Sequence, residues 1–161
     1  MLTLSGTGVG RNVTVGNAIV LDRGPQEIPK YEVSPGDVEK EIERFRSAVE
    51  RTRAELQKIQ QEIPEFAPPE IYAFIDVHLL MLNDPVITEQ PVCAIEEQFY
   101  NAEWALKTQA DTLVDLFSKI EDPYLRSKKE DVRQVVERVL AELMVGIDVP
   151  PRELADNLAG Q

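Results

Sequence analysis

Cysteine and histidine are almost absent from this sequence, which removes several kinds of site from consideration. Among 161 residues there is one cysteine, Cys93, and one histidine, His78. A single cysteine excludes a disulfide within the chain and a zinc site built on cysteines. A single histidine likewise excludes a metal centre with several histidine ligands. We therefore expect a reduced, cytoplasmic setting.

Long apolar runs and a signal peptide are missing too. No apolar run approaches the roughly 18 residues that a membrane-spanning helix needs. The opening residues, MLTLSGTGVG, lack the basic and the extended apolar region of a signal peptide. We expect no contact with a membrane.

Positive charge is scarce and unevenly spread. Lysine and arginine together number 17 against 29 acidic residues, so the formal net charge is −12. Such a surface is a poor partner for nucleic acid. No lysine or arginine occurs between Lys58 and Lys107, whereas that stretch contains many acids: Glu62, Glu65, Glu70, Asp76, Asp84, Glu89, Glu96, Glu97 and Glu103. This pattern indicates either a solvated acidic face or a docking surface for a basic partner.

What is present is typical of a helical domain. Apolar residues make up 43% of the chain and charged residues 29%, which excludes global disorder. Ser34 and Pro35 form a cap and first-turn pair, and they predict a long helix that ends before Pro64. Along it apolar residues recur at spacings of three and four, which predicts a buried seam made of Val38, Ile42, Phe45, Val49, Thr52, Leu56, Ile59 and Ile63.

Further helices are predicted at about 70–82, 85–100, 101–120 and 123–146, with Pro91 kinking or splitting the second of these. The inward sides are expected to include Ile71, Phe74, His78, Leu106, Leu113, Leu116, Phe117, Val132, Val135 and Leu143. The predicted fold is mainly α, an antiparallel bundle of four to five helices with a short β segment near 13–21. We divide the chain into 1–33, a strand and linker, 34–146, the bundle, and 147–161, a polar tail.

No intact active site is visible. The glycine-rich opening around Gly6–Gly10 does not complete a phosphate-binding pattern, because Arg11 stands where a last glycine is needed. Asp76 and His78 are two residues apart on a predicted helix and do not face each other, so a metal site is not favoured. A helix histidine that is partly buried or lies at a partner surface is the favoured interpretation of His78.

Three segments together resemble a known family. They are residues 73–85 (AFIDVHLLMLNDP), residues 122–133 (DPYLRSKKEDVR), and Gly16-Asn17-Ala18 after the glycine-rich opening. Their order and spacing are similar to the N-terminal region of enzyme I of the phosphoenolpyruvate-dependent phosphotransferase system and its nitrogen-branch relatives. One departure is that residues 10–16 keep only the last glycine of the family's opening strand.

The resemblance implies a phosphotransferase that works on histidine and serves sugar transport or its nitrogen branch. The family's phosphate-accepting histidine lies in a Gly-Gly-x-x-Ser/Thr-His type motif, which this sequence lacks. We therefore expect a fragment that is inactive by itself, with 1–33 and 147–161 belonging to an incomplete α/β subdomain. The full-length parent is expected to be a homodimer that uses Mg²⁺, and the fragment is expected to hold no cofactor.

The resemblance also implies docking of the phosphocarrier protein HPr or a nitrogen-branch paralogue. Carried over residue by residue, the docking surface comprises Glu70, Ala73, His78, Leu80, Met81, Asp84, Ile87, Phe117, Leu125 and Lys128. A helical wheel independently points Leu80 and Met81 away from the core side, as an exposed apolar patch requires. The alternative is a structural bundle that self-associates through Ile42, Val49 and Leu56, without carrier binding.

Overall fold

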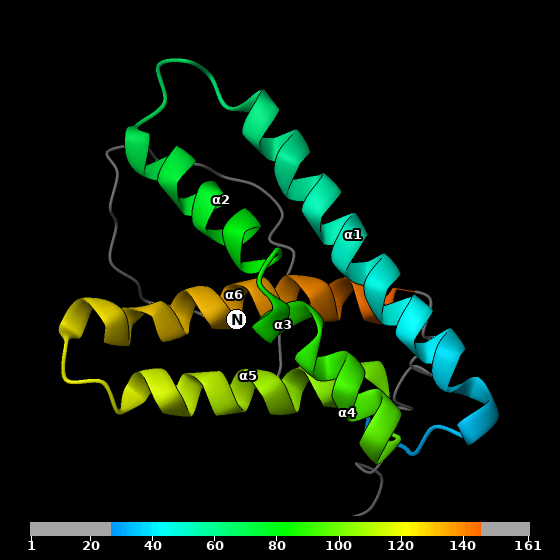
Figure 1. Ribbon diagram of the computed structural model, residues 1–161. Coiled ribbons are helices and arrows are strands. Elements are labelled where there is room, and N and C mark those ends of the chain that lie inside the picture. The colour runs from blue at the N-terminus through cyan, green and yellow to red at the C-terminus, as the bar shows by residue number, and fades with distance from the viewer. Residues whose placement is uncertain (1–26, 146–161) are drawn as a thin grey trace, which may run out of the picture.

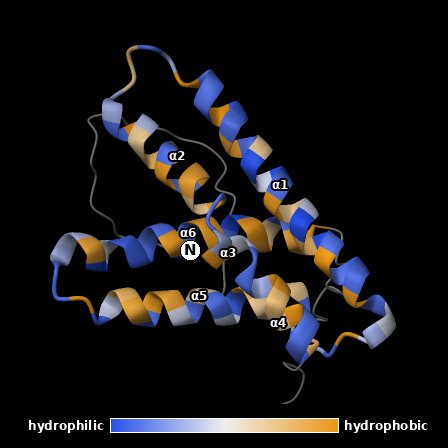
Figure 2. Cartoon of the chain, in the orientation of Figure 1, coloured by the Kyte–Doolittle hydropathy of each residue, from blue (hydrophilic) through white to orange (hydrophobic). Residues whose placement is uncertain are grey.

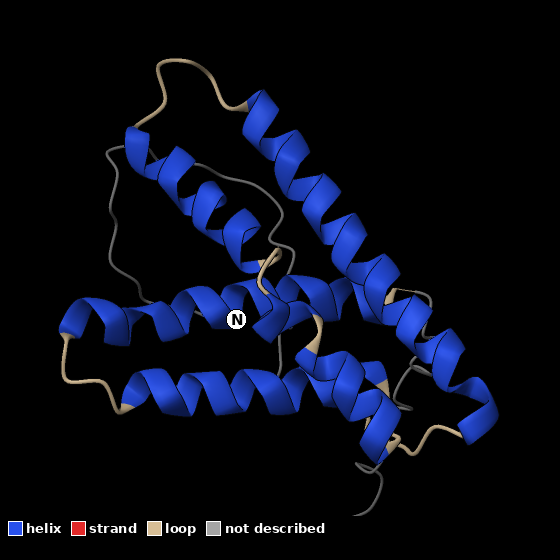
Figure 3. Cartoon of the chain, viewed as in Figure 1, coloured by secondary structure: helices blue, strands red, loops and turns tan. Residues whose placement is uncertain are grey.

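The computed structural model describes residues 27–145, and its regular secondary structure is helical throughout (Figures 1 and 3). A short 3-10 turn, η1 (Pro35–Asp37), leads into the first of a series of helices: α1 (Val38–Glu62), α2 (Pro69–Met81), α3 (Pro85–Thr88), α4 (Gln90–Gln98), α5 (Ala102–Ser118) and α6 (Pro123–Met144). The predicted mainly-α bundle is therefore confirmed. The β segment expected near 13–21, and the tail from 147, lie outside the described residues.

Two antiparallel helix pairs build the domain. Helices α5 and α6 lie side by side, while α2 folds back along α1 and the loop end of this hairpin projects away from α5 and α6 (Figure 1). Helix α1 also packs on α6 and α4, and α2 packs on α6. Within residues 27–145 no single helix is long and apolar enough to cross a membrane; only Pro69–Met81 with Pro85–Gln98, a pair bent by 61°, meets that test together.

The apolar seam of α1 is buried inside this one chain. Ile42, Phe45, Val49 and Leu56 are almost completely inaccessible to solvent, and Val38, Ile59 and Ile63 pack partly buried around the same core. The seam is covered by the other helices that pack on α1, namely α2, α4 and α6. Self-association through Ile42, Val49 and Leu56 would require unpacking the core, so the seam does not offer a free surface.

Three residues expected to point inward are exposed instead. Ile71 and Phe74 lie on the part of α2 that the projecting hairpin carries away from α5, and Leu116 is 55% exposed near the end of α5. Helix α2 is apolar along much of its length, whereas α1 is mostly hydrophilic (Figure 2). A helix that is apolar on several sides cannot bury all of them against two neighbours, so part of α2 remains uncovered.

Two aspartates cap helices, whereas the predicted cap Ser34 does not. The Asp84 carboxylate accepts from the Val86 amide at the start of α3, and the Asp122 carboxylate accepts from the Tyr124 and Leu125 amides at the start of α6. The side chains of Ser34 and Asn101 precede helices without making a capping bond. Pro91 lies in the first turn of α4, so the predicted helix over 85–100 is split at Glu89, as expected.

The capping bonds of Asp122 should contribute measurably to the free energy of unfolding. Replacing Asp122 with alanine removes both acceptor bonds to the first turn of α6, and we expect the free energy of unfolding to fall by about 1 kcal/mol. Ser34→Ala is the matched control, and it should change stability by less than about 0.5 kcal/mol because its side chain makes no capping bond. Urea unfolding of both variants tests this, and equal losses would contradict it.

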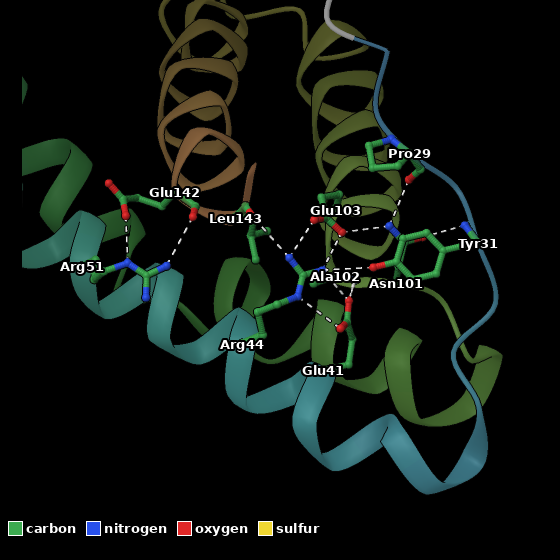
Figure 4. Close-up of polar contacts among 10 residues, drawn as sticks. All are labelled: Pro29, Tyr31, Glu41, Arg44, Arg51, Asn101, Ala102, Glu103, Glu142 and Leu143. Carbon is green, nitrogen blue, oxygen red and sulfur yellow. Dashed lines mark hydrogen bonds and ion pairs between the residues drawn. The ribbon is translucent and has the colours of Figure 1, made fainter. Parts of the chain in front are cut away.

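A buried polar network fastens the start of the described chain to the bundle (Figure 4). Arg44 donates to both carboxylate oxygens of Glu103 at 2.7 and 2.8 Å, and it also donates to Glu41 and to the Leu143 carbonyl oxygen. The side chain of Glu103 is fully buried, and it also accepts a hydrogen bond of 2.8 Å from the side-chain amide of Asn101. One arginine thus joins α1, the start of α5 and the end of α6.

The same network reaches the segment before α1. The Asn101 side chain donates to the Pro29 carbonyl and accepts from the Tyr31 amide, which explains why it does not cap α5. An isolated antiparallel bridge joins Glu32 to Tyr100 alongside it. Next to this bridge Phe99 ends α4 with φ 54°, a left-handed conformation that a non-glycine residue rarely adopts.

Candidate functional site

The acidic and histidine residues considered for metal binding do not converge. Asp76 accepts a hydrogen bond from Gln60 at 2.6 Å, Asp84 caps α3, and His78 is buried. Within residues 27–145 no group of three His, Cys, Asp or Glu side chains is placed to hold a metal ion. These residues do not fit a Mg²⁺ site, and the site that remains for consideration is a surface.

Leu80 is the most exposed of the large apolar side chains on α2. Its side chain is 71% exposed on α2, and Glu70 and Ala73 are exposed on the same helix. Leu125 is 43% exposed in the first turn of α6, where the Asp122 cap holds the backbone. These four residues lie where a partner can reach them.

Other members of the expected docking surface are less accessible. His78 and Ile87 are buried, so neither side chain can touch a partner in this conformation. Met81 and Phe117 are partly buried and pack against the core, which corrects the expectation that Met81 points fully outward. Lys128 is also partly covered, because its ammonium group is paired with Asp131 at 2.9 Å and lies 4.9 Å from the centre of the Tyr124 ring.

Contacts between helices connect the elements that carry the accessible residues. Helix α2 packs on α6, where Phe74 lies beside Gln134 and Arg138. The Gln109 amide donates to the Val86 carbonyl at 3.0 Å, so α3 lies on α5. These helices carry exposed apolar side chains, which we group as the α2–α6 face: Ala73, Leu80, Val86, Leu116, Tyr124 and Leu125.

Sequence reasoning missed three residues of this face: Val86, Leu116 and Tyr124. Tyr124 is 68% exposed because it directly follows the capped Asp122-Pro123 start of α6, where no preceding turn covers it. On a helical wheel Leu116 falls between the buried residues Ala102 and Ala105, so the pattern of α5 could not have shown that it is exposed. Nothing in the local sequence distinguishes Val86 from its buried neighbour Ile87.

The acidic stretch is mostly surface, with one exception. Glu62, Glu65, Glu70, Asp76, Asp84, Glu89, Glu96 and Glu97 are exposed. Glu103, counted with them from the sequence, is fully buried against Arg44. Burial by itself would raise the pKa of Glu103, but hydrogen bonds from Arg44 and Asn101 outweigh it and hold that pKa below its ordinary value. Glu103 therefore contributes to stability and adds no charge to the exposed face.

The fold and the surface together define a class: a helical bundle domain that presents an apolar face among acidic side chains. The chain belongs to the family described as "PEP-utilising enzyme, N-terminal", which matches residues 5–128. The resemblance to the N-terminal region of enzyme I is thereby confirmed.

The curated relatives that this chain is similar to are named phosphoenolpyruvate-protein phosphotransferase. The chain is 41% identical over 140 residues to the phosphoenolpyruvate-protein phosphotransferase of Cupriavidus necator, covering 87% of this chain and 24% of that protein. It is 32% identical over 153 residues to the enzyme of the same name from Listeria monocytogenes, covering 95% and 26%. The chain thus spans about a quarter of the length of these relatives.

Solved structures agree on the fold. An NMR solution structure of an Enzyme I (nEIt) protein matches with a TM-score of 0.68 and 25% identity, over 73% of this chain and 48% of that one. The structure titled N-terminal domain of Enzyme 1 – Nitrogen matches with a TM-score of 0.66 and 24% identity, over the same shares. At 24% identity, the similarity to the second structure shows a shared fold alone.

Proposed function

We propose that this domain docks a small phosphocarrier protein, HPr or a nitrogen-branch paralogue, on behalf of a phosphoenolpyruvate-protein phosphotransferase. The observation that carries the proposal is Leu80, a large apolar side chain that is 71% exposed on a helix surrounded by acids. In the full-length parent we expect cytoplasmic transfer of phosphate to histidine, Mg²⁺ as cofactor and a homodimer. This chain by itself is expected to be inactive.

Affinity and encounter rate are expected to come from different residues. A fully desolvated apolar centre supplies most of the binding energy at a protein interface, and here Leu80, Leu125 and Tyr124 are the exposed candidates. Exposed acids such as Glu70 and Asp76 add little affinity, but their field steers a basic partner and raises the association rate. The partner's contact surface should accordingly be apolar at its centre and basic at its rim.

Truncating Leu80 to alanine tests the proposal most directly. Loss of a central hot-spot side chain costs about 2 kcal/mol, and since about 1.4 kcal/mol is tenfold in affinity, we expect roughly thirtyfold weaker binding. Calorimetric titration of each carrier onto the unsubstituted domain, called the parent from here on, and onto the variant measures this. The carrier that binds the parent domain more tightly identifies the sugar or the nitrogen branch.

Phe66→Ala is the matched control. Phe66 is 90% exposed on the loop between α1 and α2, so its loss removes a similar exposed apolar area away from the α2–α6 face. The control should bind the carrier like the parent, and both variants should keep parental stability. Equal binding by the parent and Leu80→Ala would overturn the placement of the docking face.

Salt provides an independent check on the acidic residues. Charges separated by more than about 8 Å are largely screened at physiological ionic strength, so added salt should slow association more than it speeds dissociation. Glu70→Gln should reduce the association rate at low salt and lose that effect at high salt. Glu70 is preferable to Asp84 here, because Asp84→Asn would also disturb the cap of α3.

A further inference from the structure

His78 lies in the last turn of α2 with its ring withdrawn from solvent and from any hydrogen-bond partner among the described residues. Its exposed fraction is 0%, and neither Nδ1 nor Nε2 meets a donor or acceptor among the described residues. The ring of Phe74 lies 4.1 Å away between centroids, tilted by 53°. A polar group buried in this way is unfavourable, and the neutral imidazole is the least unfavourable form.

The charged groups that act on the ring come from α6: Asp131, Arg138 and Lys128. Asp131 is already paired with Lys128, so it cannot fully balance a new positive charge. Helix α1, which also packs on α2, makes its polar contacts to either side of His78: Arg53 donates to the Leu82 carbonyl, and Gln60 donates to Asp76. An imidazolium at this place would be buried beside two cations and one occupied carboxylate.

We propose that His78 is a positioning residue that makes the α2–α6 face sensitive to acid: its protonation loosens α2 from α6 and weakens carrier docking. A charged ring can regain hydration only if α2 moves away from α6. That movement displaces Ala73 and Leu80, which α2 carries on its accessible side. The last step, weaker docking, rests on the proposed function, whereas the loosening of α2 does not.

The pH window follows from the environment of the ring. Burial lowers the pKa of His78 below the ordinary 6.5, with Arg138 and Lys128 acting in the same direction and Asp131 opposing them. The packed state therefore keeps its full stability above pH 6.5 and loses it as the pH falls below that value. Opening takes up a proton between pH 6.5 and the lowered pKa, so the opening constant should rise there by up to about tenfold for each pH unit. Carboxylates titrate mainly near pH 4, below this window.

Hydrogen exchange measures the loosening without a carrier. Amide exchange of α2 and α5 is followed at about pH 7.5 and about pH 5.5, after correction for the intrinsic rates, and α2 alone should open more often at the lower pH, by up to about tenfold. His78→Leu should abolish this response, and His78→Gln serves if the leucine variant does not fold. His78 is the only histidine, so its proton NMR titration reports its pKa without overlap.

The carrier titration is then repeated at both pH values with the parent and with His78→Leu. A loss of affinity at the lower pH in the parent, of up to about tenfold and absent in the variant, supports the proposal. Identical α2 exchange at both pH values, or a response that His78→Leu retains, overturns it. If α2 loosens but the parent binds no carrier at either pH, the proposed function fails, and with it the docking step of this proposal.

Discussion

Replacing Arg44 with methionine is expected to lower the free energy of unfolding by about 3–5 kcal/mol. Methionine keeps much of the side-chain volume, but it leaves the Glu103 and Glu41 carboxylates near each other without their shared cation. Glu103 is fully buried, so its uncompensated charge cannot be screened by water. Urea unfolding near neutral pH measures the loss.

Arg51→Met is the control for this prediction. Arg51 also extends from α1 to α6, where it pairs with Glu142 at 2.8 Å, but its side chain is 53% exposed. An exposed pair contributes about 0–1 kcal/mol, so the control should lose little. If the two variants lose the same amount, the buried network is not what holds α1, α5 and α6 together.

The Arg44 variant should also respond differently to pH. In the parent the pKa of Glu103 is lowered, so the stability it contributes is present above the ordinary value of 4.5 and is lost as the pH falls through the lowered pKa. Without Arg44, burial is expected to raise that pKa, and the variant should become less stable as the pH rises. The difference between parent and variant should thus widen from acid to neutral pH.

Truncating Phe45 to alanine is expected to be comparably damaging, at about 3–5 kcal/mol. Phe45 is the largest fully buried side chain of the α1 seam, and its loss would leave a cavity between helices that cannot simply collapse. Thermal and urea unfolding measure the change. Sedimentation at several concentrations should show that the parent does not associate through this seam.

Leu116→Ala is the matched control for Phe45. Both positions were expected to point inward from the sequence, but Leu116 is 55% exposed, so its truncation should change stability by less than about 0.5 kcal/mol. A large loss at Leu116 together with a small one at Phe45 would contradict the packing described here.

Helix positions were predictable from the sequence because their signals are local. Pro35, Pro69, Pro85, Pro91 and Pro123 all lie within the first turn of a helical segment, where proline is tolerated. The three- and four-residue spacing along α1 identified its buried side, because that spacing returns to the same side of a helix at every turn. Asp122 was likewise recognisable as a cap from its place before Pro123 and Tyr124.

Exposure was less predictable than helicity. The pattern of α2 offers apolar residues on several sides, and it cannot show which side the neighbouring helices cover. Ile71 and Phe74 share the helical side of His78, yet they are exposed, and Phe74 borders an open hollow on α6 instead of being covered by it. The docking residues transferred from the family therefore divide into accessible ones, such as Leu80, and buried ones, such as Ile87.

The sequence by itself determined the helical class, the family and the acidic character of the stretch between Lys58 and Lys107, since these depend on composition and on short-range pattern. Only the tertiary structure decided that Arg44 meets Glu103 across 59 residues and that His78 is enclosed without a partner. Both outcomes depend on how helices distant in the chain pack together. Burial then sets the energetics, because a charge or an unpaired ring that water would solvate at the surface becomes costly inside.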